Sequence, residues 1–287
     1  PNAPDGRPTI GRYIQEMMLA NDLNAMDRLY EFLGQEYINK QLLAKGYKSV
    51  QILHRPGNNL SDDENRHTNP VSFYNRGIRT ALFTQPMQYS EMIFGPRNDF
   101  IGKGYMNDTI LVSSPMNFSA MNRISLDDLN TMMIALLFPE KCRVEERFNI
   151  TDADRKFLLK YMSQLPGESG YPGFDTAVVD ISPKYLFYGN DKKEIAGNPR
   201  IFNVTGMEYG QLTDIAFIID TEKKLSFILA ATIYCNNDGI LNDDHYNYQQ
   251  TGLPFMKNIG RLVYEYELTR KRNNVPDLSP FLFTYDK

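Results

Sequence analysis

The chain has 287 residues, with 31 Lys and Arg against 35 Asp and Glu, a net charge of −4 and a pI near 5.5. This balance argues against a nucleic-acid-binding surface, which is usually strongly basic, and no apolar run approaches the ~20 residues that span a bilayer. The length suffices for one large domain or two small ones, and two cysteines are too few for a disulfide framework.

Three helices are predicted at the start of the chain. Thr9 can cap the first, in which apolar residues recur at helical spacing, and Gly34 is a typical stop for the second. They are expected at residues 10–18, 25–33 and 36–44. The chain therefore begins as a helical segment.

Residues 54–122 differ in kind from this helical start. They hold ten Gly and Pro residues and only short apolar runs, which predicts a long, mostly irregular insertion. A hairpin is expected between Thr80 and Phe94. A loop of this length inside a compact domain is usually functional or binds a partner.

Regular elements return after the insertion. Ser125-Leu-Asp-Asp128 resembles a capping box at the start of a helix that Pro139 ends, and Thr151 opens the next helix. A Gly- and Pro-rich loop is expected at 166–173, a short helix around Tyr185, strands at 200–205, 211–219 and 225–234, and a final helix at 254–271. This order predicts an α+β fold, in which one antiparallel sheet is flanked by helices and accompanied by a mostly helical subdomain.

The first two strands contain the most informative segment. We interpret them as joined through Gly206 and Gly210, and Val204-Thr205-Gly206 differs by one residue from Lys-Thr-Gly. Followed by a glycine turn and a hydrophobic strand, this tripeptide resembles the Lys-Thr-Gly strand of class A β-lactamases, which are penicillin-recognising serine hydrolases. Residues 18–34 resemble the Ser-Asp-Asn loop of that family and the helix after it. With the later helices, collinear similarity runs from about residue 9 to residue 272, interrupted by the insertion.

The resemblance implies a reaction and a location. In the family a serine in Ser-x-x-Lys attacks an acyl carbonyl, the Ser-Asp-Asn serine relays a proton, and the Lys-Thr-Gly lysine attracts the substrate carboxylate. The expected activity is acyl transfer on β-lactam or peptidoglycan-peptide-like substrates. It needs no metal and no organic cofactor, and it is expected in the periplasm or cell envelope.

The sequence differs from the family at all three motifs that this activity requires. No Ser-x-x-Lys occurs; the order of the family would place it before residue 9, and the chain starts too late to hold it. Asn21-Asp22-Leu23 stands where the family has Ser-Asp-Asn, and the register one residue earlier, Ala20-Asn21-Asp22, lacks the hydroxyl too. Val204 replaces the lysine of the third motif, while Thr205 and Gly206 remain. The chain thus has motif-equivalent positions but no confirmed catalytic residue.

Some polar residues that could suggest a functional site have a structural interpretation instead. Asp22 is expected to be the N-cap of the helix that contains Ala25. Asp243, Asp244 and His245 are adjacent residues of a polar loop and lack the ligand spacing of a calcium site. No metal ligand is therefore predicted.

The sequence predicts a single β-lactamase-like domain over residues 1–287, with the insertion at 54–122. This domain is expected to bind a small molecule or a peptide, and its hydrolytic activity is expected to be absent or impaired. Two alternatives stay open: a pseudoenzyme that uses the groove only for binding, and a cell-envelope module that binds a protein through the insertion. Strand 225–234 would leave an exposed hydrophobic edge, because in the family it pairs with the first strand. We expect an upstream segment, a second copy in a homodimer or part of the insertion to cover it.

Overall fold

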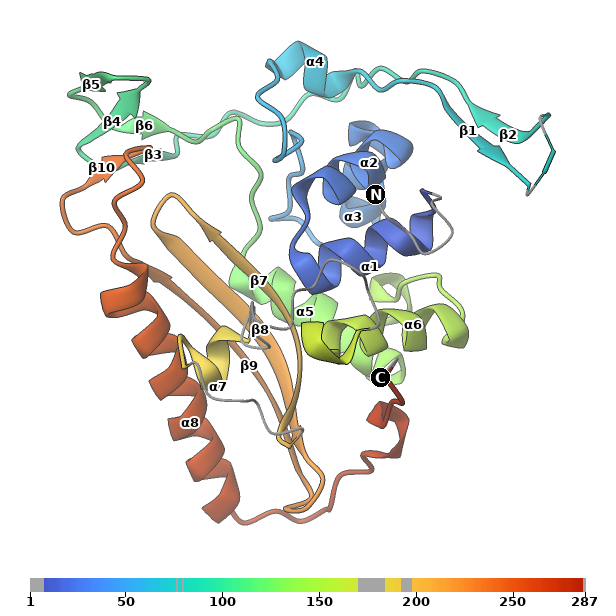
Figure 1. Ribbon diagram of the computed structural model, residues 1–287, viewed down its shortest axis with the longest axis vertical. Coiled ribbons are helices and arrows are strands. Elements are labelled where there is room, and N and C mark those ends of the chain that lie inside the picture. Colours follow the sequence, from blue (N-terminus) through green and yellow to red (C-terminus); the bar gives the residue numbers. More distant parts are fainter. Residues whose placement is uncertain (1–7, 76, 79, 170–183, 192–197, 286–287) are drawn as a thin grey trace.

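The computed structural model describes residues 8–75, 77–78, 80–169, 184–191 and 198–285, and it shows an α+β fold (Figure 1). A three-stranded antiparallel sheet in the order β7-β8-β9 forms its centre. The strands are β7 (Arg200–Glu208), β8 (Gln211–Asp220) and β9 (Leu225–Tyr234). The predicted class and all three strands are confirmed, and β7 continues beyond its predicted end. The loop predicted at 166–173 lies partly outside the described residues.

Both faces of the sheet are covered by helices. The covering helices are α5 (Leu126–Leu137) and α6 (Asp152–Ser163) on one face, and α7 (Tyr185–Tyr188) and α8 (Leu253–Thr269) on the other. On β8, side chains alternate between the two layers: Ile215, Phe217 and Ile219 face the first, and Leu212, Ala216 and Ile218 face the second. Burial on both faces explains why this strand is almost continuously apolar.

A glycine allows α8 to approach α7 closely. A Cβ built on Gly260 would lie 2.5 Å from the backbone N of Phe187, which is closer than any side chain can come. Leu253 and Met256 of α8 are buried in the layer between this helix and the sheet. The predicted amphipathic final helix is thus confirmed.

The helical start of the chain also matches the prediction. It consists of α1 (Ile10–Ala20), α2 (Leu23–Leu33) and α3 (Gln35–Ala44). Thr9 accepts a hydrogen bond from the backbone N–H of Arg12, and Gly34 ends α2 with a φ of 77°, a conformation that favours glycine. Ser125 and Thr151 cap α5 and α6 in the same way as Thr9 caps α1.

The insertion consists of short elements and long extended connections. They are α4 (Asp62–Arg66), β1 (Val71–Tyr74), β2 (Ala81–Gln85), β3 (Phe100–Ile101), β4 (Gly104–Asn107), β5 (Ile110–Val112) and β6 (Met116–Asn117). The strands β1 and β2 form a hairpin. The hairpin predicted between Thr80 and Phe94 is therefore wrong. The strands of the observed hairpin lie on either side of Thr80. Their pairing stops before Pro86, which has no backbone N–H to donate to a neighbouring strand.

The insertion extends from α2 to the end of the central sheet. At one end, Glu31 of α2 accepts hydrogen bonds from the backbone and the side chain of Asn69. At the other, β4 pairs in parallel with β10 (Ile240–Leu241), and the Phe118 ring packs edge-on against Tyr209 with 5.2 Å between ring centroids. Among the described residues β9 pairs only with β8, so the insertion does not cover that edge as a paired strand. Cover by an upstream segment or a second copy stays a prediction.

The turn between β7 and β8 differs from the sequence interpretation. Glu208 pairs with Gln211, so Tyr209 and Gly210 form a two-residue turn in which both residues have positive φ, 49° and 79°. This conformation is typical of type I′ hairpins, which favour glycine at the second position. Of the two glycines, Gly206 lies inside β7 and Gly210 lies in the turn.

Candidate functional site

The motif strand β7 is an edge strand whose first half is covered. Residues 201–203 are buried, and β7 contacts α6, whereas the segment from Val204 to Glu208 is mostly exposed. Val204 is 41% exposed, and a Cβ built on Gly206 would meet no atom within 4 Å. Within the described part of the chain, β8 is the only strand that pairs with β7. The outer edge of residues 204–208 can therefore offer backbone N–H and C=O groups to an extended ligand.

Asn21, Asp22 and Leu23 form the junction between α1 and α2, where their roles are structural. Asn21 has a left-handed backbone (φ 52°), and its N–H donates to carbonyls at the end of α1. The Asp22 carboxylate accepts a hydrogen bond from the backbone N–H of Ala25 at 2.9 Å, which confirms the predicted N-cap. Leu23 is largely exposed. None of the three supplies a hydroxyl or a cation.

The helix α6 links the two motif positions. It contacts both α1, which residues 21–23 follow, and β7, which contains residues 204–206. Thr205 is the only hydroxyl residue among the motif positions, and its side chain lies beside the half-buried phenol of Tyr185. The structure thus places no hydroxyl–lysine pair at these positions.

A buried polar network lies directly behind β7. Lys184 Nζ donates to the Met162 carbonyl and to Asn203 Oδ1, both at 2.6 Å. Asn203 Nδ2 donates to Asp214 Oδ1 at 3.0 Å, and the backbone N–H of Leu186 donates to Asp214 Oδ2 at 2.8 Å. The side chains of Lys184, Asn203 and Asp214 are all buried. The network joins the loop before α7 to two strands of the sheet.

Burial moves both ionisable groups of this network toward their neutral forms. Desolvation lowers the pKa of Lys184 to about 7, and the charge of Asp214 opposes that shift. Desolvation also raises the pKa of Asp214 to about 7, against the hydrogen bonds from Leu186 and Asn203. Lys184 therefore does not replace the missing lysine of Lys-Thr-Gly, because its Nζ is used inside the protein and presents little positive charge to the exposed edge.

One member of the network has a recognisable sequence signal. Asp214 is a single acid within the apolar run from Leu212 to Ile219. An acid in a strand buried on both faces has to be hydrogen-bonded or neutral, so its position alone indicates a buried partner. Lys184 has no comparable signal, since its partners Met162 and Asn203 come from distant segments.

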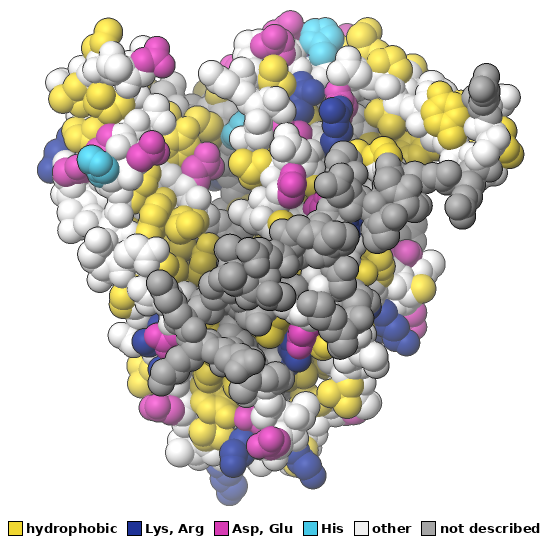
Figure 2. Space-filling model, in the orientation of Figure 1, with side chains coloured by type: hydrophobic (Ala, Val, Ile, Leu, Met, Phe, Trp, Pro, Cys, Tyr) yellow, Lys and Arg dark blue, Asp and Glu magenta, His cyan; other side chains and the backbone are white. Residues whose placement is uncertain are grey.

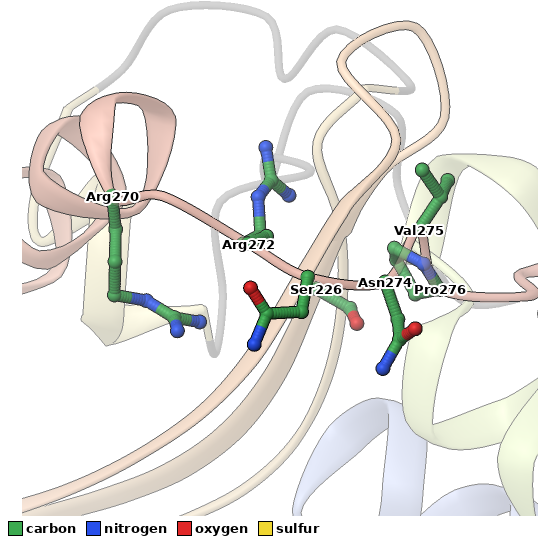
Figure 3. A pocket seen from close by; sticks show the side chains of 7 residues that line it. Ser226, Arg270, Arg272, Asn274, Val275 and Pro276 are labelled. Atoms are coloured by element: carbon green, nitrogen blue, oxygen red, sulfur yellow. The ribbon is translucent and has the colours of Figure 1, made fainter.

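A hollow of about 340 Å³ lies away from the motif positions (Figure 3). It is lined by Ser226, near the start of β9, and by residues of the segment 270–276, after α8. The Arg272 guanidinium on this segment donates to the Lys224 carbonyl at 3.0 Å. By strand register Ser226 lies level with the start of β7, roughly 20 Å along the strand from Gly206. The hollow is therefore separate from the motif positions.

The polar loop after β9 contains the adjacent residues Asp243, Asp244 and His245. Asp243 accepts a hydrogen bond from the backbone N–H of His245 within the loop. Among the residues that the structure describes, no three His, Cys, Asp or Glu side chains are grouped so that they could hold a metal ion. Within the same residues, no helix combines the length and the apolar character that crossing a membrane requires.

Asp22→Ala is expected to lower the free energy of unfolding by about 1 kcal/mol, the usual cost of losing an N-cap. Urea unfolding of the variant and the wild type measures this difference. Asn24→Ala is the matched control, because Asn24 is exposed in the first turn of the same helix. A loss above about 3 kcal/mol for Asp22→Ala would show that this carboxylate does more than cap α2.

Comparison with known proteins adds no relative to this description. No protein-family model, no curated protein and no solved structure matches the chain. Its function is therefore inferred from the motif positions, their burial and their hydrogen bonds.

Proposed function

We propose that the chain is a β-lactamase-like serine hydrolase domain that binds a ligand along β7 but does not itself carry out acyl transfer. The proposal rests on the roles that the two motif positions have in the structure. Asp22 is a helix cap, and an exposed Val204 stands on an edge strand where the family has a lysine. The order of helices, antiparallel sheet and final packed helix is compatible with that family.

The chemistry of acyl transfer explains why binding is the better-supported activity. The reaction needs an activated hydroxyl and preorganised donors for the oxyanion. Neither motif position has a hydroxyl next to a lysine, and the buried Lys184 already donates to Met162 and Asn203. Loss of one unit of such a constellation typically costs orders of magnitude in rate.

Binding has weaker requirements than catalysis. An extended peptide can add to a free sheet edge through main-chain hydrogen bonds, and side-chain pockets then set specificity. Residues 204–208 form such an edge, and Gly206 leaves open space beside it. The ligand we propose is a peptide of the peptidoglycan-stem type or a β-lactam that resembles it.

Two measurements test the proposal. Nitrocefin should not be hydrolysed above the buffer rate, and a stem-type peptide should protect residues 204–208 from hydrogen exchange. Gly206→Val should abolish that protection without loss of stability, because the added side chain enters open space. Thr232→Val, at an exposed position on β9, is the matched control and should leave the protection unchanged.

The outcomes separate the two halves of the proposal. Nitrocefin turnover by the wild type would contradict the absence of acyl transfer. A peptide that leaves residues 204–208 of the wild type unprotected would contradict binding along this edge, and protection that persists in Gly206→Val would show that the space beside Gly206 is not part of the ligand site.

A further inference from the structure

The hairpin of β1 and β2 carries apolar side chains that are exposed. Tyr74, Ile78, Leu82 and Phe83 are each more than half exposed, and we call these four residues the hairpin surface. The hairpin projects from the upper right of the molecule, and hydrophobic side chains lie on it (Figures 1 and 2). These side chains come from both faces of the hairpin, because Leu82 and Phe83 are successive residues of β2. Two-stranded hairpins are marginally stable in water on their own, and exposed apolar side chains grouped on one element mark binding surfaces.

Contacts at its base hold the hairpin in place. The Phe73 ring packs edge-on against Phe32 of α2 with 5.2 Å between centroids, and Gln85 Nε2 donates to the Phe32 carbonyl. The hydroxyls of Ser72 and Thr84 hydrogen-bond across the two strands at 2.9 Å. The base is therefore bound to the body, while the hairpin surface is presented outward.

The hairpin itself is basic and contains no acids. Residues 71–85 include Arg76 and Arg79 but neither Asp nor Glu, in a chain whose net charge is −4. The nearest acids in the sequence, Glu64 and Glu91, lie outside the hairpin. A partner for this segment must accept positive charge next to apolar side chains. Two copies that docked their hairpins about a twofold axis would bring like charges together, which disfavours that arrangement. An anionic surface with an apolar interior meets both requirements.

We propose that the hairpin surface docks this protein on an anionic phospholipid membrane. Aromatic and aliphatic side chains partition into the interfacial region of a bilayer, and arginines are attracted to anionic headgroups. Each contribution alone gives weak binding, and the two together give stable but reversible attachment. This docking lies beyond the proposed ligand site on β7 and does not depend on it.

Co-sedimentation of the full chain with vesicles tests this docking. Vesicles of equal parts phosphatidylcholine and phosphatidylglycerol should bind the wild type about tenfold more strongly than pure phosphatidylcholine, because the cations favour anionic headgroups. Leu82→Ser should lower the partition coefficient about tenfold, since it removes an apolar side chain from the inserted surface. Ile110→Ser is the matched control: Ile110 on β5 is 68% exposed, against 62% for Leu82, and lies outside the acid-free segment. It should leave partitioning unchanged.

Thermal unfolding of both variants, which should match the wild type, excludes misfolding as a cause. Equal binding to the two kinds of vesicle, or binding to neither, would overturn the proposal. A wild-type dimer in sedimentation velocity that Leu82→Ser dissociates would also overturn it, because the hairpin surface would then be covered by a second copy. An equal effect of Ile110→Ser would show that binding is not specific to the hairpin.

Discussion

Asp214→Ala is expected to lower the free energy of unfolding by about 3–5 kcal/mol. The substitution removes the carboxyl group that accepts hydrogen bonds from two buried donors, the Leu186 backbone N–H and Asn203 Nδ2. Each such donor costs roughly 1–3 kcal/mol, and Lys184 also loses the acid whose charge most favours its protonated form. Urea unfolding followed by circular dichroism measures the loss. Thr213→Ala, at the next position on β8, is the control and should cost under about 1 kcal/mol.

Asp214→Asn tests whether the buried carboxyl is neutral. Burial raises the pKa of Asp214 from 3.8 to about 7, so over that interval the folded chain holds a proton that the unfolded chain has released. The stabilisation by this carboxyl is therefore fully present at pH values below 3.8, and it is lost as the pH rises through about 7. Asn does not titrate, so the wild type should lose stability relative to Asp214→Asn as the pH rises across the interval. A pH-independent difference would contradict a neutral Asp214.

Glu31→Ala is expected to cost about 2–3 kcal/mol and to loosen the insertion. Glu31 Oε1 accepts hydrogen bonds from the backbone and side chain of Asn69 at 3.2 and 2.6 Å, and it lies 3.6 Å from the Arg55 guanidinium. Because Arg55 is buried, removal of the acid leaves a buried cation without its carboxylate. Limited proteolysis should then cut within residues 54–122 faster than in the wild type.

Glu145→Ala is the matched control for this substitution. Glu145 lies outside the insertion and pairs with Arg143, and the side chains of both residues are more than half exposed. Exposed pairs of this kind contribute little, so neither stability nor proteolysis should change measurably. If the two variants were cleaved alike, Glu31 would not be what holds the insertion to α2.

The helices and central strands could be predicted because their signals are local. A capping side chain followed by apolar periodicity located α1, α5 and α6, and long runs of β-branched and aromatic residues located β8 and β9. The β1–β2 hairpin could not be placed in the same way. Its base is fixed by the contact of Phe73 with Phe32 on a distant helix, which no local pattern encodes. The pairing of β4 with β10 involves only two residues on each strand, too few for any periodicity.

The candidate site was predictable in part for the same reason. The N-cap role of Asp22 follows from the residues beside it, and Val204-Thr205-Gly206 was placed on a strand by its neighbours. The buried network behind that strand depends on Lys184, whose partners meet it only in the folded chain. Periodicity and motif spacing carry no information about such contacts.

Intact-mass measurement after incubation with a fluorescent penicillin tests most directly the claim that this chain does not carry out acyl transfer. The motif positions offer no serine next to a lysine, and Val204 presents no cation to the penicillin carboxylate. We therefore expect the mass of the chain to stay unchanged and no label to remain after denaturation. A mass increase equal to one penicillin, with the label mapped to a residue of this chain, would contradict the account.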